Sequence, residues 1–167
     1  MMQEISFSAP WGTELKVMTT ISVIILVGTV VLGIFIGPHN SVGYIFAMFV
    51  LPLSILVISA FFTIRGYVLT GDTLFIRRPR WSSKLDLSEL VSAEYDPRAM
   101  AGSIRTCGNG GMFCFAGACR NKKLGSYRAF VTDEKLSVVL RFKTRVVVVT
   151  PENPEDFVVK INKLRNL

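Results

Sequence analysis

The stretch that decides the fold is Val17–Ile36, VMTTISVIILVGTVVLGIFI, followed five residues later by Val42–Ile64, VGYIFAMFVLPLSILVISAFFTI. The first run contains no charged residue over 20 positions and the second contains none over 23 positions. A helix rises about 1.5 Å per residue, so each run reaches roughly 30 Å, the thickness of the hydrocarbon core of a bilayer. The sequence therefore predicts two membrane-spanning helices.

The linker between the two runs, Gly37–Ser41, is long enough only to reverse the chain, which predicts an antiparallel hairpin. It contains no Lys or Arg, whereas Lys16 precedes the hairpin and Arg65 and Arg77 follow it. This bias predicts an inner-membrane protein with both termini in the cytoplasm. A cleaved signal peptide is the alternative interpretation of the first run, but the run is long for one and no small-x-small cleavage site follows it.

These features divide the chain into an N-terminal cytoplasmic segment (1–16), a hairpin (17–64, with helices at 17–36 and 42–64) and a soluble domain (65–167). The soluble domain holds 18 Lys and Arg against 10 Asp and Glu, because Lys16, Glu4 and Glu14 account for the rest of the 19 and 12. A basic domain beside a membrane attracts anionic lipid head groups, by about 1 kcal/mol per well-placed cation. Nucleic acid is not an expected partner, because the basic residues are dispersed and the domain is tethered.

Inside the hairpin, Thr29, Gly33 and Gly37 recur every four residues and share one helical face. Small residues let helix backbones approach closely in lipid, so this face predicts helix packing, either within one chain or between two copies. Pro52 lies in the middle of the second run and predicts a bend there. Neither run contains an acidic or basic residue, which argues against an ion or proton path.

From Gly66 onward, short stretches of strand-forming residues alternate with turn signals, and a helix with an apolar stripe follows from Asn153. Residues 96–111 contain four glycines and are expected to form a loop. The stripe of the terminal helix predicts that it covers one end of a curved antiparallel sheet of about seven strands. The expected strands are 67–70, 73–78, 81–87, 112–118, 126–132, 136–142 and 145–150, with extended or irregular structure over 90–95, and the stripe consists of Phe157, Ile161 and Leu164.

Five segments of the soluble domain, in this order, resemble the bacterial PH-like (pleckstrin-homology-like) domain family, in which such a domain follows a transmembrane hairpin. The resemblance covers residues 65–167 and implies an all-β PH-like barrel or sandwich of about seven antiparallel strands, capped by one C-terminal helix. The matching segments are YVLTGDTL (67–74), LDLSEL (85–90), RTCGNGGMF (105–113), GSYRAFVT (125–132) and TPENPEDF (150–157).

The resemblance implies a membrane location but no reaction. We therefore expect a membrane-anchored, non-catalytic binding or regulatory module that docks a protein partner of unknown identity, anionic lipid head groups, or both. The alternative is a structural subunit of a membrane assembly that is recognised through its hairpin.

The segment Arg77-Arg78-Pro79-Arg80-Trp81 is the candidate lipid contact. The first strand leaves the membrane directly after Arg65, so its antiparallel partner must return toward the membrane and end near the head groups. Guanidinium groups can bind phosphates through two parallel hydrogen bonds, and Trp is enriched at membrane interfaces. We expect Arg77, Arg78, Arg80 and Trp81 to contact lipid head groups.

Two other motifs do not predict phosphate sites. A phosphoinositide pocket of the eukaryotic kind needs a roomy basic loop between the first two strands, and here that loop is Gly71-Asp72, which is short and acidic. The Gly108–Gly111 segment lacks the Lys of a phosphate-binding loop and precedes an expected strand, so a strand-connecting loop is predicted.

Metal, cofactor and enzyme chemistry find no support. Cys107, Cys114 and Cys119 follow a C-x6-C-x4-C pattern, unlike the paired arms of a zinc site, and disulfides are not expected in the cytoplasm. The only histidine, His39, lies in the linker on the opposite side of the membrane from these thiols. We expect reduced, partly buried thiols, no metal, no cofactor and no enzymatic activity.

Overall fold

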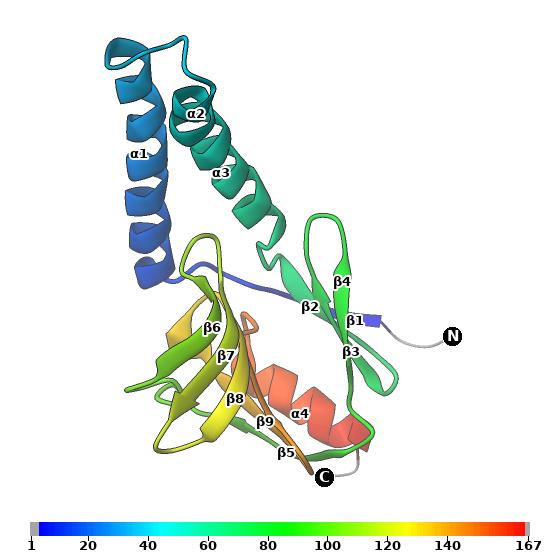
Figure 1. Cartoon of the computed structure of the whole chain (residues 1–167). Coiled ribbons are helices and arrows are strands. Elements are labelled where there is room, and N and C mark those ends of the chain that lie inside the picture. The colour runs from blue at the N-terminus through cyan, green and yellow to red at the C-terminus, as the bar shows by residue number, and fades with distance from the viewer. Residues whose placement is uncertain (1–3, 166–167) are drawn as a thin grey trace.

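The structure is a computed structural model that describes residues 4–165, and it consists of a helical hairpin standing on a two-sheet domain (Figure 1). The elements in chain order are β1 Glu4–Ser8, α1 Thr13–Phe35, α2 Val42–Ile45, a π-helical turn Phe46–Val50, α3 Leu51–Phe61, β2 Gly66–Thr70, β3 Thr73–Arg77, β4 Ser82–Asp86, β5 Leu90–Tyr95, β6 Ile104–Gly110, β7 Phe115–Asn121, β8 Gly125–Val131, a 3₁₀ turn Glu134–Leu136, β9 Val138–Phe142, β10 Val146–Val149 and α4 Pro154–Arg165.

The hairpin contains two helices that are long and apolar enough to cross a membrane, Thr13–Phe35 and Val42–Phe61, which confirms this part of the prediction. Only 11% and 6% of the residues in their most apolar stretches are buried, so these are not core helices of the domain below. The second helix is interrupted by the π-helical turn, in which the N–H of Leu51 donates to the carbonyl of Phe46. The next residue, Pro52, has no N–H and would clash with a carbonyl four residues earlier, so the backbone widens just before it.

The smaller sheet has four strands in the order β1-β2-β3-β4, and all of its pairings are antiparallel. The predicted pairing of β2 with β3 across Gly71-Asp72 is confirmed. The strand β1 lies in the segment before α1, and its Glu4 to Ser8 pair with Thr70 to Gly66 of β2. The soluble domain therefore draws strands from both sides of the hairpin, rather than only from residues after it.

The larger sheet has six strands in the order β5-β9-β10-β8-β7-β6. Strand β10 pairs in parallel with β8, so the expectation of a purely antiparallel sheet is wrong at this position. With β1 and β6, the described part of the chain contains ten strands instead of about seven. The two-sheet architecture with a C-terminal helix agrees with the prediction.

The expectation of a loop over 96–111 is wrong, because β6 occupies Ile104–Gly110 and pairs with β7. The glycines of this hairpin allow the backbones of β6 and β7 to approach each other closely. A Cβ on Gly108 would lie 2.2 Å from the carbonyl oxygen of Ala116, and one on Gly117 would lie 2.0 Å from that of Cys107. Only glycine fits at these two facing positions, so a composition typical of a loop forms a tight β-hairpin instead.

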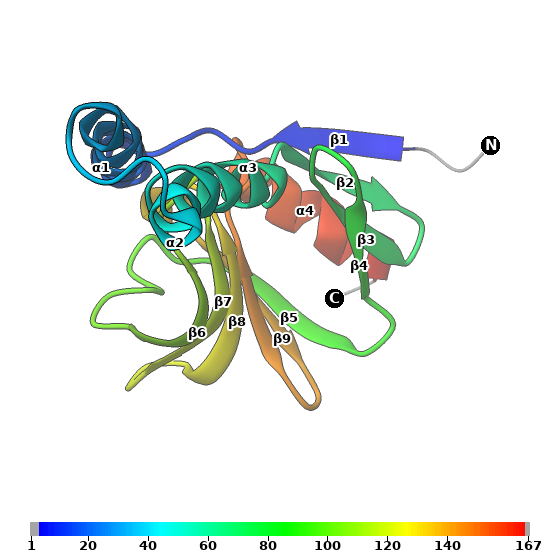
Figure 2. The same ribbon diagram turned by 45° about the horizontal axis from the view of Figure 1, so that its top comes forward.

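The helix α4 closes the space between the two sheets, as Figures 1 and 2 show from two directions. Its Phe157 and Ile161 are fully buried, and the ring of Phe157 makes an edge contact with Phe7 of β1 at a centroid distance of 5.0 Å. Leu164, the third member of the predicted stripe, remains 42% exposed. Phe157 and Ile161 of the stripe therefore pack as expected, in a core that contains residues of both sheets.

A buried hydrogen-bond network joins the two sheets around Tyr67 of β2. Its hydroxyl donates to the carbonyl of Phe130 in β8 at 2.7 Å and accepts from the N–H of Thr150 at 3.1 Å. The N–H of Thr132 in turn donates to the hydroxyl of Thr150 at 2.9 Å. Burial raises the pKa of Tyr67 from 10.0 to about 12, because the phenolate loses its hydration in this position.

We predict that Tyr67→Phe lowers the free energy of unfolding by about 1–3 kcal/mol, because it leaves buried backbone groups without a partner. Ionisation of Tyr67 also makes the free energy of unfolding depend on pH. The neutral phenol is favoured in the folded state, so its contribution is complete below pH 10 and is lost as the pH rises toward about 12. Denaturant unfolding of the full chain in detergent should show this alkaline loss for the parent and a smaller one for the variant. Identical curves for the two proteins would contradict the role of Tyr67.

Candidate functional site

The base of α1 is held by the turn between β6 and β7. The hydroxyl of Thr19 donates to the carbonyl of Gly111 at 3.0 Å and accepts from the N–H of Phe113 at 3.0 Å. Leu15, one turn earlier, is fully buried against the larger sheet, and Thr19 is 6% exposed. One side of the first turns of α1 is therefore part of the domain, while the exposed apolar surface on its other side begins at Val17 and Met18.

The end of α3 is held by two side chains of the domain. The carbonyl of Phe62, at the C-terminus of the helix, accepts from Nη1 of Arg78 at 2.8 Å and from Sγ of Cys114 at 3.2 Å. Carbonyls at a helix C-terminus lack partners within the helix, and a basic side chain is favoured there. We call these contacts, together with those of Thr19, the hairpin clamp.

The turn between β3 and β4 lies against the same end of α3, as the antiparallel geometry of these strands predicts. The ring of Trp81 makes an edge contact with Phe62 at a centroid distance of 5.2 Å, and the guanidinium of Arg80 lies 5.6 Å from the ring centroid of Phe61. Arg77 is exposed at the end of β3, and Trp81 is 41% exposed. Arg78 differs from its neighbours because it turns inward and is half-buried.

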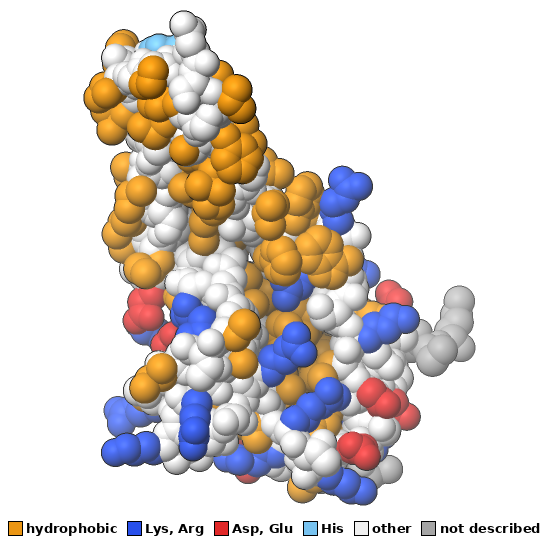
Figure 3. Space-filling view, in the orientation of Figure 1, with side chains coloured by type: hydrophobic (Ala, Val, Ile, Leu, Met, Phe, Trp, Pro, Cys, Tyr) orange, Lys and Arg blue, Asp and Glu red, His pale blue; other side chains and the backbone are white. Residues whose placement is uncertain are grey.

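A groove of about 1210 Å³ opens between the two sheets beside this turn. One wall comes from β3 and β4, and the other comes from the faces of β6, β7, β8 and the start of β10. Figure 3 shows Lys and Arg side chains around the apolar surface of this part of the domain. The cations that line the groove are Arg78, Lys84, Arg128 and Arg145, and its apolar floor includes Ile76, Leu85, Phe130 and Val147.

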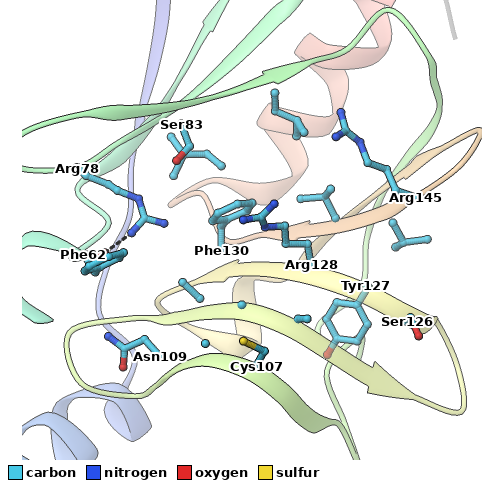
Figure 4. Close-up of a pocket in the computed structure, with 18 of the residues that line it drawn as sticks. Phe62, Arg78, Ser83, Cys107, Asn109, Ser126, Tyr127, Arg128, Phe130 and Arg145 are labelled. Atoms are coloured by element: carbon cyan, nitrogen blue, oxygen red, sulfur yellow. Dashed lines mark hydrogen bonds between the residues drawn. The ribbon is translucent and has the colours of Figure 1, made fainter.

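Two of these cations converge on one aromatic ring. The guanidinium carbons of Arg78 and Arg128 lie 5.8 and 5.5 Å from the ring centroid of Phe130 (Figure 4). Burial lowers the pKa of Arg78, and the charge of Arg128 acts in the same direction. Within the described chain, the Nε of Arg78 has no hydrogen-bond partner.

The described residues that line the groove include four cations and no carboxylate. Outside the lining, Asp86 lies close enough to interact with Arg145. The ion pairs of the described chain lie elsewhere, and they are Lys123–Asp96, Lys160–Asp156 and Arg165–Asp72. The groove therefore offers an anion several guanidinium donors beside an apolar surface.

Small residues of the β6–β7 hairpin keep the groove open. Ala116 and Ala118 line it with short side chains, and Gly108 and Gly117, where a Cβ would meet backbone atoms, line it with backbone alone. Sequence reasoning missed the groove, because its walls come from strands distant in sequence. The sequence signal that could have indicated it is the run of small residues Ala116-Gly117-Ala118, in the strand that precedes Arg128.

The three cysteines do not form a common site. Cys107 is exposed in the groove wall, whereas Cys114 and Cys119 are buried. Burial raises the pKa of Cys114 to about 11 and also raises the pKa of Cys119. Within residues 4–165, no group of three His, Cys, Asp or Glu side chains could hold a metal ion. His39 lies at the hairpin tip, where its Nε2 is 3.1 Å from the carbonyl of Ile34.

The small-residue face of α1 is used within the chain. A Cβ on Gly33 would lie 3.0 Å from the Cβ of Met48, and the hydroxyl of Tyr44 donates to the carbonyl of Gly33 at 2.9 Å. A Cβ on Gly37 would meet the ring of Tyr44 at 2.5 Å. Thr29 donates to the carbonyl of Ile25, one turn earlier in its own helix. At Gly33 and Gly37, the structure therefore shows packing between the two arms of one hairpin.

Comparison with known proteins identifies the domain. Residues 65–165 match the family model of the bacterial PH domain, which accounts for more than half of the chain. No curated protein and no solved structure gave a match. PH domains are in general non-catalytic modules that bind lipids or proteins. The sandwich of two sheets with its C-terminal helix agrees with the match, and the chain belongs to the bacterial PH domain family.

Proposed function

We propose that this protein is a membrane-anchored, non-catalytic binding module that contacts anionic lipid head groups at the cytoplasmic face through Arg77, Arg78, Arg80 and Trp81. The observation that carries the proposal is the position of the β3–β4 turn against Phe61 and Phe62, at the end of an exposed apolar helix. If α3 crosses the bilayer, these side chains lie at head-group level. Arginine and tryptophan are suited to that level by charge and by amphipathic shape.

The distribution of charge supports the membrane assignment. On the face in Figure 3, hydrophobic side chains cover the hairpin, and charged side chains are confined to its base and to the domain. Large apolar residues such as Ile24, Ile25 and Ile58 are exposed along the hairpin. An exposed apolar surface of this extent would be unstable in water and is stable in lipid.

The same distribution supports a location in the inner membrane with both termini in the cytoplasm. The domain and the base of the hairpin carry the Lys and Arg residues, and Gly37–Ser41 at the tip carries none. Cytoplasmic segments near membrane spans are enriched in Lys and Arg. The tip would then face the periplasm.

A protein partner remains part of the proposal. Strand β5 is an edge of the six-stranded sheet beside α4, and an extended peptide can add to such an edge. The alternative of a structural subunit recognised through the hairpin finds less support, because Gly33 and Gly37 already pack against residues of the same hairpin.

The topology can be tested with two variants that each carry one exposed cysteine, made in a Cys107→Ser background, since Cys114 and Cys119 are buried. We predict that His39→Cys reacts with a membrane-impermeant maleimide added outside spheroplasts. Lys122→Cys, in the exposed turn between β7 and β8, should react only after the membrane is permeabilised. Labelling of Lys122→Cys in intact spheroplasts would contradict the cytoplasmic location.

The head-group contact can be tested with the full chain in nanodiscs that contain spin-labelled phosphatidylglycerol or spin-labelled phosphatidylcholine. We predict that the protein immobilises the anionic lipid in preference to the neutral one. The double variant Arg77→Gln/Arg80→Gln should lose most of this preference, because each cation near the surface contributes about 1 kcal/mol.

The matched control is Lys122→Gln/Lys163→Gln, which removes the same charge from exposed positions away from the β3–β4 turn. This control should keep the preference for phosphatidylglycerol. Equal losses in both double variants would show that net charge alone attracts the lipid, and would contradict a specific role for the turn.

A further inference from the structure

We infer that the groove between the two sheets binds one anionic phospholipid molecule, with its phosphate between Arg78 and Arg128 and its acyl chains leaving past Ile58 and Phe62 into the bilayer. The inference rests on the proposed function, because the groove must open at the membrane surface. The two proposals describe different contacts. The β3–β4 turn makes brief contacts with many exchanging head groups, whereas the groove binds a single lipid molecule stably.

The first argument is charge. Arg78 and Arg128 flank Phe130, and Lys84 and Arg145 stand farther along the walls. No carboxylate among the described lining residues neutralises them. Arg78 and Arg128 have no carboxylate partner among the described ion pairs and repel each other, so an anion between them gains from both. Guanidinium groups also match the oxygens of a phosphate in shape.

The second argument is the apolar floor. A site for a free phosphate or a nucleotide would surround the anion with polar groups. Here the cations stand above Ile76, Phe130 and Val147, which are themselves buried. The volume of about 1210 Å³ also exceeds the range of about 300–1,000 Å³ that is typical of small-molecule pockets. A charged group attached to a long apolar body fits both features.

The third argument is continuity with the membrane. Ile58 of α3 and Phe62 just after it line the groove, and both remain exposed, at 57% and 41%. An acyl chain that leaves the groove past these two residues would stay on an apolar surface along the helix. The hairpin clamp fixes this geometry, because Arg78 contacts both the end of α3 and the groove.

An extended peptide fits the same groove less well. Of the strands that line the groove, β7, β8 and β10 pair with a neighbour on both sides, whereas β4 and β6 are edge strands. Backbone N–H and C=O groups for strand addition are therefore available at β4 and β6 and not at β7, β8 and β10. Around Arg128 and Val147 the groove presents side chains rather than a strand edge, which favours a ligand without a backbone at this position.

The test uses the full chain, extracted in a mild detergent from membranes that contain both neutral and anionic phospholipids, and measures retained lipid by native mass spectrometry. We expect one anionic phospholipid per chain. Arg128→Gln should weaken its retention about tenfold, because a charge-assisted contact is lost. Ala118→Phe should displace the lipid by filling the groove at an exposed strand position, without changing any charge.

The control is Lys122→Gln, which removes a cation outside the groove and should retain the lipid like the parent. Circular dichroism of each variant confirms that it is folded. Arg78 is left unchanged in this test, because its contact with Phe62 also supports the helix end. Arg77→Gln/Arg80→Gln should keep the bound lipid while losing the general preference for anionic lipid in nanodiscs.

Several results would overturn the inference. They are retention of neutral and anionic lipids alike, retention that Arg128→Gln and Ala118→Phe leave unchanged, or a co-purifying peptide that Ala118→Phe displaces. None of these results changes the nanodisc experiment, in which the preference for anionic lipid is tested separately with Arg77→Gln/Arg80→Gln. A failure of the groove can therefore be distinguished from a failure of the proposed function.

Discussion

The hairpin clamp is the constraint on which the rest of the structure depends. Thr19 binds the turn between β6 and β7, and the carbonyl of Phe62 binds Arg78 and Cys114. Each sheet thus contacts the hairpin through a short hydrogen-bonded connection, and no flexible linker separates the two parts. Where the hairpin enters the bilayer, the domain must follow. If the hairpin crosses a bilayer as proposed, these few contacts set the position of the basic side chains relative to it.

The closed part of the domain allows another face to remain unfilled. Around Tyr67 and Phe157, the two sheets are joined by a buried polar network and by the apolar side of α4. Away from this closed part, Gly108 and Gly117 present only backbone to the groove, and Ala116 and Ala118 present short side chains. Protein interiors otherwise pack as densely as organic crystals, so a persistent groove in a small sandwich must be maintained by its sequence. Here the short side chains of Ala116 and Ala118 leave it unfilled, and the cations above them make it polar at its rim.

Local patterns predicted those elements whose cause is local. The uncharged runs identified both helices of the hairpin, Gly71-Asp72 identified the β2–β3 hairpin, and Pro154 marked the start of α4. The antiparallel return of β3 also placed the turn around Arg80 beside the end of α3. Contact of that turn with lipid stays a prediction.

Elements whose cause is distant in sequence could not be found in this way. Strand β1 becomes a strand only because β2 pairs with it after the chain has passed through the whole hairpin. Strand β6 was hidden by its glycines, whose purpose appears only once Gly117 lies opposite Gly108. The parallel pairing of β10 with β8, and the groove itself, arise from residues of several separate strands. In the candidate site, the charges of Arg77, Arg78 and Arg80 were visible in the sequence, but the inward turn of Arg78 was not.

The central claim is that the clamped base of the hairpin sits at the membrane interface, and the depth of Trp81 tests it most directly. The chain contains two tryptophans, so Trp11→Phe leaves Trp81 as the single fluorophore. The full-length variant is reconstituted with phospholipids brominated either near the head group or near the end of the acyl chains. This account predicts that bromines near the head group quench Trp81 strongly and that those near the bilayer centre quench it weakly. Emission that neither lipid quenches would contradict it.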